Sequence, residues 1–136
     1  MKKKTFAVDI DGTITENGGG RIHLDALEAL RRLTNMGHDV IYVTGRSSVE
    51  AYLLSVFGGT RNIAVGENGG CIALDVNDHV LLGRVEECNK AFELIKNNID
   101  GVQKKPVFPR LTEVVLERTF DMNDARKILS ENNIDV

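Results

Sequence analysis

The chain of 136 residues has little cysteine, no excess of basic charge and no long apolar run. Its two cysteines, Cys71 and Cys88, lack the CxxC spacing of zinc and redox sites, so we expect reduced, packed thiols in a cytoplasmic protein. The formal net charge of −3 gives no basic footprint for nucleic acid or an anionic membrane. The apolar run that follows Lys2-Lys3-Lys4 is too short for a signal peptide, and none is long enough to cross a bilayer. We therefore expect a soluble protein that binds neither nucleic acid nor membrane.

Short apolar runs, separated by amphipathic stretches, are what the first half of the sequence does contain. Residues 4–10 and 40–43 are nearly continuous runs that predict strands buried on both faces, and residues 63–65 predict a third, shorter strand. The segments between them have helical periodicity. Strand, helix, strand, helix, strand with short connections predicts right-handed βαβ units, and therefore an α/β fold with a doubly wound, Rossmann-like parallel sheet.

The two helices of this first half have recognisable starts and stops. The first contains leucines at every third residue and stops at Gly37. The second begins at Ser47, which has capping-box spacing with Glu50, and ends near Gly58-Gly59. The leucines of the first helix are Leu24, Leu27, Leu30 and Leu33.

The pattern changes after residues 67–70. Residues 71–74 and 79–82 flank a turn and predict an antiparallel hairpin. A helix is expected at about 85–98, a strand at 112–120, and a last helix that reaches about Asn133. This order predicts a separate α+β layer, and residues 134–136 resemble the first residues of another strand.

The candidate chemistry begins with Asp9 and Asp11, at the carboxyl end of the first strand. Side chains alternate along a strand, so both carboxylates project to one side, at the edge where open α/β sheets bind ligands. Such a pair can hold a divalent metal or divide into nucleophile and acid. Gly12 permits a tight turn whose amides can point at an anion. The structural alternative is a simple strand end with an Asp-Gly turn.

The second and third strands end at the same edge with further polar groups. Thr44-Gly45-Arg46 supplies a hydroxyl and main-chain amides directly before a capped helix N-terminus, which binds phosphate readily. Residues 67–70, with Asn68, add a polar side chain and a flexible joint. The alternatives are an ordinary strand-to-helix turn and a solvated Arg46.

These motifs resemble those of a known family. Residues 8–13 (VDIDGT) match the first motif of haloacid dehalogenase (HAD) superfamily phosphatases, residues 41–46 (IYVTGR) match the second, and residues 67–70 (ENGG) resemble the point where Cof-like members enter an α+β cap of the C2 type. The resemblance covers essentially the whole chain. It implies a HAD core at residues 1–68, incomplete, and part of an inserted cap at residues 69–136.

The resemblance also implies roles for individual residues. Asp9 would be the nucleophile that forms an aspartyl-phosphate, and Asp11 the acid and base. Mg2+ would bind the Asp9 carboxylate and the Asp11 carbonyl, and the substrate would be a small phosphorylated metabolite. The residues expected to contact the phosphate or the rest of the substrate are Ile10, Gly12, Thr13, Thr44, Gly45, Arg46 and Asn68.

Two further parts of the family pattern, a lysine and an acidic motif, are not found in convincing form. Lys104-Lys105 precede Pro106 and are better explained as solvated side chains. Residues 120–124 imitate the acidic motif, but Asp121 and Asp124 have the spacing of helix N-terminal capping. We therefore expect the chain to be a truncated form of a longer protein of roughly 220 residues. The sheet edge beside Asp9 would then be completed by the missing segment, by a partner chain or by self-association.

Three alternatives remain open at this stage. A catalytically incompetent fragment would act only through association, and a minimal capless phosphatase would use residues 120–124 as its acidic motif. A phosphotransfer receiver domain also has an acidic cluster on a parallel sheet, but Thr44-Gly45-Arg46 and the following hairpin fit it poorly.

Overall fold

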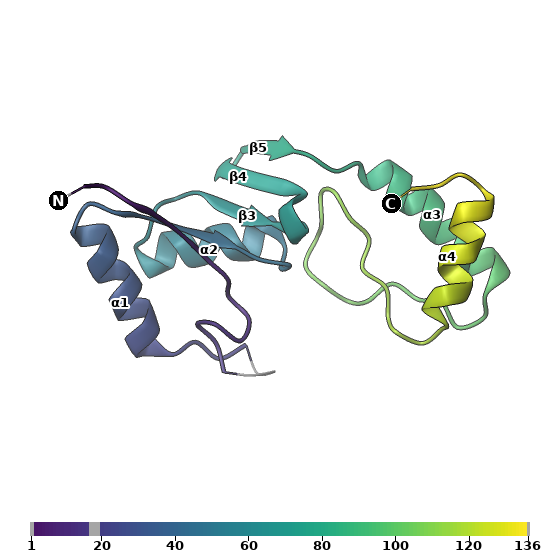
Figure 1. Cartoon of the computed structure of the whole chain (residues 1–136), viewed down its shortest axis with the longest axis horizontal. Coiled ribbons are helices and arrows are strands. Elements are labelled where there is room, and N and C mark those ends of the chain that lie inside the picture. The colour runs from purple at the N-terminus through teal and green to yellow at the C-terminus, as the bar shows by residue number, and fades with distance from the viewer. Residues whose placement is uncertain (1, 17–19, 136) are drawn as a thin grey trace. The chain divides into compact units, whose positions relative to one another are not determined.

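A computed structural model describes residues 2–16 and 20–135 of the chain. The chain divides into two compact units, Met1–Leu82 and Gly83–Val136, and each is described by itself (Figure 1). None of the helices among these residues is long and apolar enough to cross a membrane. The boundary implied by the family resemblance, at residues 68 and 69, remains a proposal about where the cap begins.

The first unit is built on a five-stranded sheet with the order β1-β2-β3-β4-β5 among the described residues. The first three strands are parallel, and β4 and β5 form the antiparallel hairpin, as the sequence predicted. The strands are β1 (Thr5–Val8), β2 (Asp39–Val43), β3 (Ala64–Gly66), β4 (Cys71–Asp75) and β5 (Asp78–Leu81).

Helices α1 (Leu24–Asn35) and α2 (Ser48–Gly58) connect the parallel strands, and the short 3-10 helix η1 (Glu67–Gly69) follows β3. Right-handed crossovers that advance along a sheet in one direction place both helices on the same face, and Figure 1 shows α1 and α2 on one side of the strands. The predicted βαβαβ order and both helices are therefore confirmed.

The register of the sheet shows which face is buried. Phe6 pairs with Val40, and Val8 pairs with Tyr42, so these four side chains share one face. Val40 and Tyr42 are fully buried, and Ala64 continues this core on β3.

The prediction that the first strand is buried on both faces is wrong. Thr5 and Ala7 are exposed, whereas Phe6 and Val8 are half-buried. The physical reason is that, among the described residues, β1 pairs with β2 alone and so lies at the edge of the sheet. An edge position for the strand that leads to Asp9 was expected, and the sheet order confirms it.

The second unit contains α3 (Val85–Asn98) and α4 (Met122–Glu131), which contact each other. Its core consists of Phe92, Ile95, Val102 and Ala125. The helix predicted at 85–98 has these bounds in the structure, and the last helix ends slightly before Asn133. Ile134 and Asp135 are not in a strand, and Val136 lies outside the described residues.

The strand predicted at 112–120 is wrong. In its place the structure has a single antiparallel bridge between Lys104 and Leu116, flanked by two main-chain hydrogen bonds. The apolar residues 114–116 are a local signal, but a strand needs a continuous partner, and here the pairing with residues 103–105 extends no further than this bridge and its two bonds.

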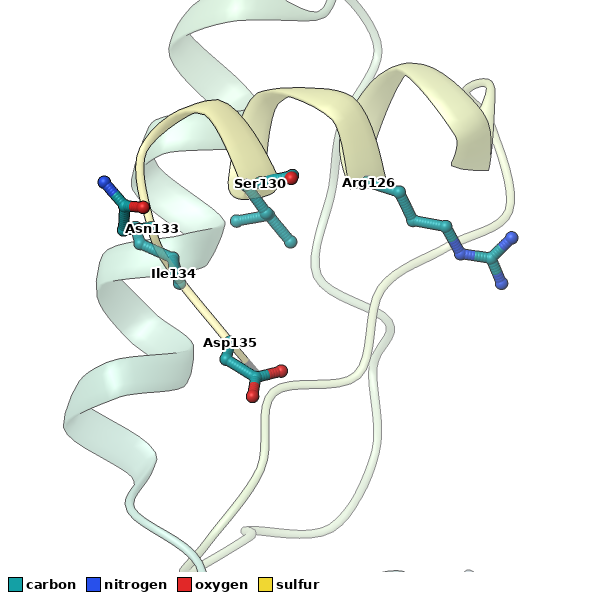
Figure 2. A pocket seen from close by; sticks show the side chains of 6 residues that line it. Arg126, Ser130, Asn133, Ile134 and Asp135 are labelled. Atoms are coloured by element: carbon teal, nitrogen blue, oxygen red, sulfur yellow. The ribbon is translucent and has the colours of Figure 1, made fainter.

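A shallow hollow of about 500 Å³ lies at the end of α4. Figure 2 shows Arg126 and Ser130 on the helix, with Asn133, Ile134 and Asp135 on the segment that follows. None of the residues predicted to carry chemistry lines this hollow.

Candidate active site

The loop after β1 forms a tight turn around the carbonyl of Ile10. Ile10 is buried, and its carbonyl oxygen accepts hydrogen bonds from the amides of Thr13, Ile14 and Thr15, at 3.2, 3.0 and 3.2 Å. Gly12 has a φ of 75°, which a residue with a side chain adopts only with strain. The burial of Ile10 leaves Asp9 and Asp11 exposed on either side of it, as strand alternation predicted.

The amides of Gly12 and Thr13 have partners within this turn. Gly12 donates to the hydroxyl of Thr15 over 3.1 Å, and Thr13 donates to the carbonyl of Ile10. A direct role for these amides in holding a phosphate would require breaking those bonds. In the structure, Gly12 and Thr13 therefore shape the loop that presents the two aspartates.

The ends of β2 and β3 lie against each other through Thr44. Thr44 is buried, its amide donates to Val65 and its carbonyl accepts from the amide of Asn68. A Cβ on Gly45 would lie 2.8 Å from Oδ1 of Asn68, so a side chain at this position would displace the end of the Asn68 side chain. Three residues predicted separately from two strand ends, namely Thr44, Gly45 and Asn68, are thus brought together.

Arg46 joins the loop after β1 to the start of α2. Its Nε and Nη2 atoms donate to the two carboxylate oxygens of Asp11, at 2.8 and 2.7 Å, and its Nη1 donates to Oε1 of Glu50 at 2.9 Å. The hydrogen bonds from Arg46 lower the pKa of Asp11, and those to Asp11 and Glu50 raise the pKa of Arg46. Sequence reasoning identified Glu50 only as a capping residue. Its spacing of four residues from Arg46, which directly precedes the N-cap of α2, was the signal for this second contact.

The start of α2 is occupied by carboxylates of the chain itself. Ser47 and Glu50 form the predicted capping box, with each main-chain amide accepted by the other side chain. Glu67, which is only 2% exposed, accepts from the hydroxyl and the amide of Ser48, at 3.1 and 3.4 Å. The amides of Ser47, Ser48 and Glu50 thus have acceptors within the chain. Phosphate binding at this helix terminus stays a prediction, and it would require these amides to exchange partners.

Asp9 differs from Asp11 in having no such partner. Its carboxylate takes part in none of the hydrogen bonds or ion pairs found among residues 2–16 and 20–135, and its side chain is exposed. The Asp9 carboxylate is therefore free to reach a ligand, whereas the Asp11 carboxylate is committed to Arg46.

The oxygen donors near Asp9 fit a magnesium ion that keeps much of its water. The described residues contain no group of three or more His, Cys, Asp or Glu side chains that could hold a metal. Mg2+, however, is often held by one or two protein oxygens together with water and substrate phosphate. The Asp11 carboxylate is paired with Arg46, so this loop would offer the Asp9 carboxylate and the Asp11 carbonyl.

Asp121 and Lys104, from the two segments that imitate the missing family motifs, make local contacts within the second unit. Oδ1 of Asp121 accepts the amide of Asn123 at 2.7 Å, so this acidic segment does cap α4. Lys104 is exposed, but its ammonium group donates to Asn89 and lies 4.6 Å from the ring centre of Phe92. Both features serve the second unit itself.

Residues 6–132 match the model of the haloacid dehalogenase-like hydrolases, and the chain belongs to this family. It is 76% identical over 136 residues to a phosphoglycolate phosphatase of Nitrosopumilus maritimus, an alignment that covers 100% of this chain and 59% of that protein. A phosphoglycolate phosphatase of Methanosarcina mazei is 34% identical over 100% of this chain and 58% of its own length. The chain thus spans about three fifths of the length of these relatives.

Solved structures agree on the fold. The structure of Thermoplasma acidophilum 0175 superposes with a TM-score of 0.80 and 22% sequence identity, over 98% of this chain and 58% of that one. The C-terminal domain of Candida albicans trehalose-6-phosphate phosphatase superposes with a TM-score of 0.59 and 17% identity, over 96% and 49%. At these identities the likeness concerns the fold alone, and it confirms the predicted HAD-like α/β architecture.

Proposed function

We propose that this chain carries the phosphoryl-accepting part of a Mg2+-dependent phosphomonoester hydrolase that works through an aspartyl-phosphate. The observation that carries the proposal is the contrast between Asp9, exposed and unpaired, and Asp11, which Arg46 holds by both oxygens. Parallel β1 and β2 pair Val8 with Tyr42, so the segments that follow them leave the sheet at the same edge. This places the aspartates and Thr44 at one end of the sheet.

In the proposed reaction, a carboxylate oxygen of Asp9 attacks phosphorus, and the bond from phosphorus to the ester oxygen breaks. Asp11 in its protonated form, which requires release of at least one hydrogen bond from Arg46, gives that proton to the departing alkoxide, which leaves as an alcohol. Asp11 then takes a proton from water, whose oxygen attacks the aspartyl-phosphate and releases inorganic phosphate and the free Asp9 carboxylate. The hydroxyl of Thr44 would contact a phosphoryl oxygen in both steps. Mg2+, held by the Asp9 carboxylate and the Asp11 carbonyl, would neutralise phosphoryl charge when bound.

For the substrate we infer 2-phosphoglycolate, with glycolate as the product. The support is the 76% identity to a protein described as phosphoglycolate phosphatase and the agreement of six further relatives with that description. The wording of the motifs, DIDGTIT at residues 9–15 and VTGR at residues 43–46, resembles the same enzymes. Another sugar-phosphate substrate of the Cof-like group is the main competing specificity.

A second candidate function, association without catalysis, is favoured by the edge position of β1. An edge strand presents unpaired main-chain groups to another chain. A native mass measurement would distinguish this function, because a monomer with turnover excludes a role limited to association.

The test of the main proposal is Asp9→Asn, with Asp25→Asn as the matched control. Asp25 is also exposed but lies on α1. Hydrolysis of 2-phosphoglycolate and p-nitrophenyl phosphate would be measured with Mg2+, and beryllofluoride binding would be followed by 19F NMR as a mimic of the aspartyl-phosphate. We expect Asp9→Asn to lose at least about a thousandfold in kcat and to lose the beryllofluoride signal, while Asp25→Asn keeps both. Unchanged hydrolysis in Asp9→Asn would show that Asp9 is not the nucleophile.

A further inference from the structure

We propose that Glu50 is a positioning residue for Asp11, acting through Arg46. This proposal rests on the proposed function only for the role given to Asp11 in the reaction. The three side chains form a continuous chain of charge from the loop after β1 to the first turn of α2, and the sequence separation between Asp11 and Arg46 is 35 residues.

Arg46 is anchored at both ends, which fixes the direction of its planar group. Two of its nitrogens face the two oxygens of Asp11, and a third nitrogen faces Glu50. A guanidinium paired with a single exposed carboxylate can change orientation together with it. A guanidinium that also donates to a second carboxylate keeps one orientation and offers its two parallel N–H groups in a fixed direction. The orientation of the Asp11 carboxylate therefore depends on Glu50, which it does not touch.

Glu50 in turn is held by the helix cap. Its Oε2 atom accepts from the amide and the hydroxyl of Ser47, at 3.1 and 3.0 Å, and its Oε1 atom accepts from Arg46. The two oxygens thus have separate partners. The capping box fixes the Glu50 side chain on the helix backbone. Through Arg46, Glu50 then restricts the orientation of Asp11 in the loop, and a fixed orientation is what a residue that transfers protons requires.

A second pair on α1 shows what an ordinary surface contact looks like. Arg32 and Glu28 also pair at helical spacing, but their side chains are 73% and 60% exposed, and neither has a second charged partner among residues 2–16 and 20–135. The corresponding values for Arg46 and Glu50 are 35% and 21%. Exposed pairs contribute little to stability, so Glu28→Gln is the matched control for Glu50→Gln.

Glu50→Gln separates the two roles of Glu50. Glutamine is accepted at this position of a capping box, so the start of α2 should persist and the melting temperature should stay close to that of the unchanged chain. The residue loses its negative charge toward Arg46, which frees the guanidinium to move. Arg46→Lys tests the same chain of contacts from its centre, because lysine keeps the charge but cannot form the two parallel bonds to Asp11.

The experiment measures one spectroscopic and one kinetic quantity for each variant, with Mg2+ present. The first is the 13Cγ shift of Asp11 together with the exchange rate of the Arg46 Nε–H. We expect Glu50→Gln and Arg46→Lys to move both, or to remove the Nε–H signal, and Glu28→Gln to move neither. The second is p-nitrophenyl phosphate hydrolysis, where Glu50→Gln should lower kcat by about 10- to 100-fold with little change in KM.

A double variant decides whether the effect passes through Arg46. If it does, Glu50→Gln should cost no further kcat once Arg46→Lys is in place, because coupled residues are not additive. Additive losses, or an Asp11 signal unmoved in Glu50→Gln, would overturn the proposal. Absence of turnover and of beryllofluoride binding in the unchanged chain would count against the proposed function instead, and the Asp11 and Arg46 signals would still decide the role of Glu50.

Discussion

The interactions that stabilise the interior differ between the two units of the chain. In the first, parallel strands fix residues far apart in sequence side by side, and the buried core lies between the sheet and its two helices. In the second, two helices enclose a small core, and the long segment between them has one isolated bridge. The unit with fixed strand register carries the candidate chemistry, because three strand ends can then present side chains at one edge. The second unit depends more heavily on a few large side chains.

The largest expected effect is therefore in the second unit. Phe92 is 7% exposed at the centre of the smaller core, and we expect Phe92→Ala to cost about 3–5 kcal/mol of its stability. Hydrogen exchange should show loss of protection in α3 and α4 and retained protection in β2. Phe57→Ala is the control, since Phe57 is 81% exposed on α2. Equal loss of protection in β2 would mean that the two units unfold as one.

Close main-chain packing in the first unit gives the next effect. A Cβ on Gly66 would lie 2.5 Å from the main-chain nitrogen and Cα of Ser48, which cannot move without shifting α2. We expect Gly66→Ala to cost about 1–3 kcal/mol in urea unfolding. At Gly58 the nearest atom is the end of the flexible Leu27 side chain, at 3.0 Å, so Gly58→Ala should be much milder. Similar losses in both would contradict this account of the packing between β3 and α2.

The sequence predicted elements whose signals are local. The three parallel strands, the hairpin, and helix α3 at Val85–Asn98 all follow from periodicity and turn residues. The strand expected at 112–120 is wrong because a strand depends on a partner, and here the pairing is limited to one bridge between Lys104 and Leu116. The residue pattern of one segment does not show whether a partner strand is available to pair with it.

The candidate site was predictable to the same extent. Strand ends located Asp9, Asp11 and Thr44, since each directly follows an apolar run. The two hydrogen bonds from Arg46 to Asp11 could not be predicted, because they depend on how close the loops that carry these residues lie in the folded chain. The capping box predicted the partner of one oxygen of Glu50 and gave no information about the other.

The N-terminal caps of α2 and α4 also differ between the two units. Ser47 is fully buried in a reciprocal box on α2, whereas Asp121 is exposed and accepts a single amide on α4. Removal of a cap costs about 0.5–2 kcal/mol, and we expect Ser47→Ala near the upper limit and Asp121→Ala near the lower. Thermal unfolding followed by circular dichroism would measure both. The reverse order would show that burial does not strengthen the first cap.

The smallest predicted effect concerns Lys104, on the core of the second unit. Its ammonium group lies 4.6 Å from the centre of the Phe92 ring and 2.9 Å from Oδ1 of Asn89. Because Lys104 is exposed, we expect Lys104→Gln to cost only about 0.5–1 kcal/mol, measured by urea unfolding. Lys105→Gln changes the same charge at the neighbouring exposed position and should cost less. In Phe92→Ala the effect of Lys104→Gln should shrink, because the ring is gone. An undiminished effect there would assign the contribution of Lys104 to Asn89, and no effect in the unchanged chain would make Lys104 the solvated side chain that the sequence predicted.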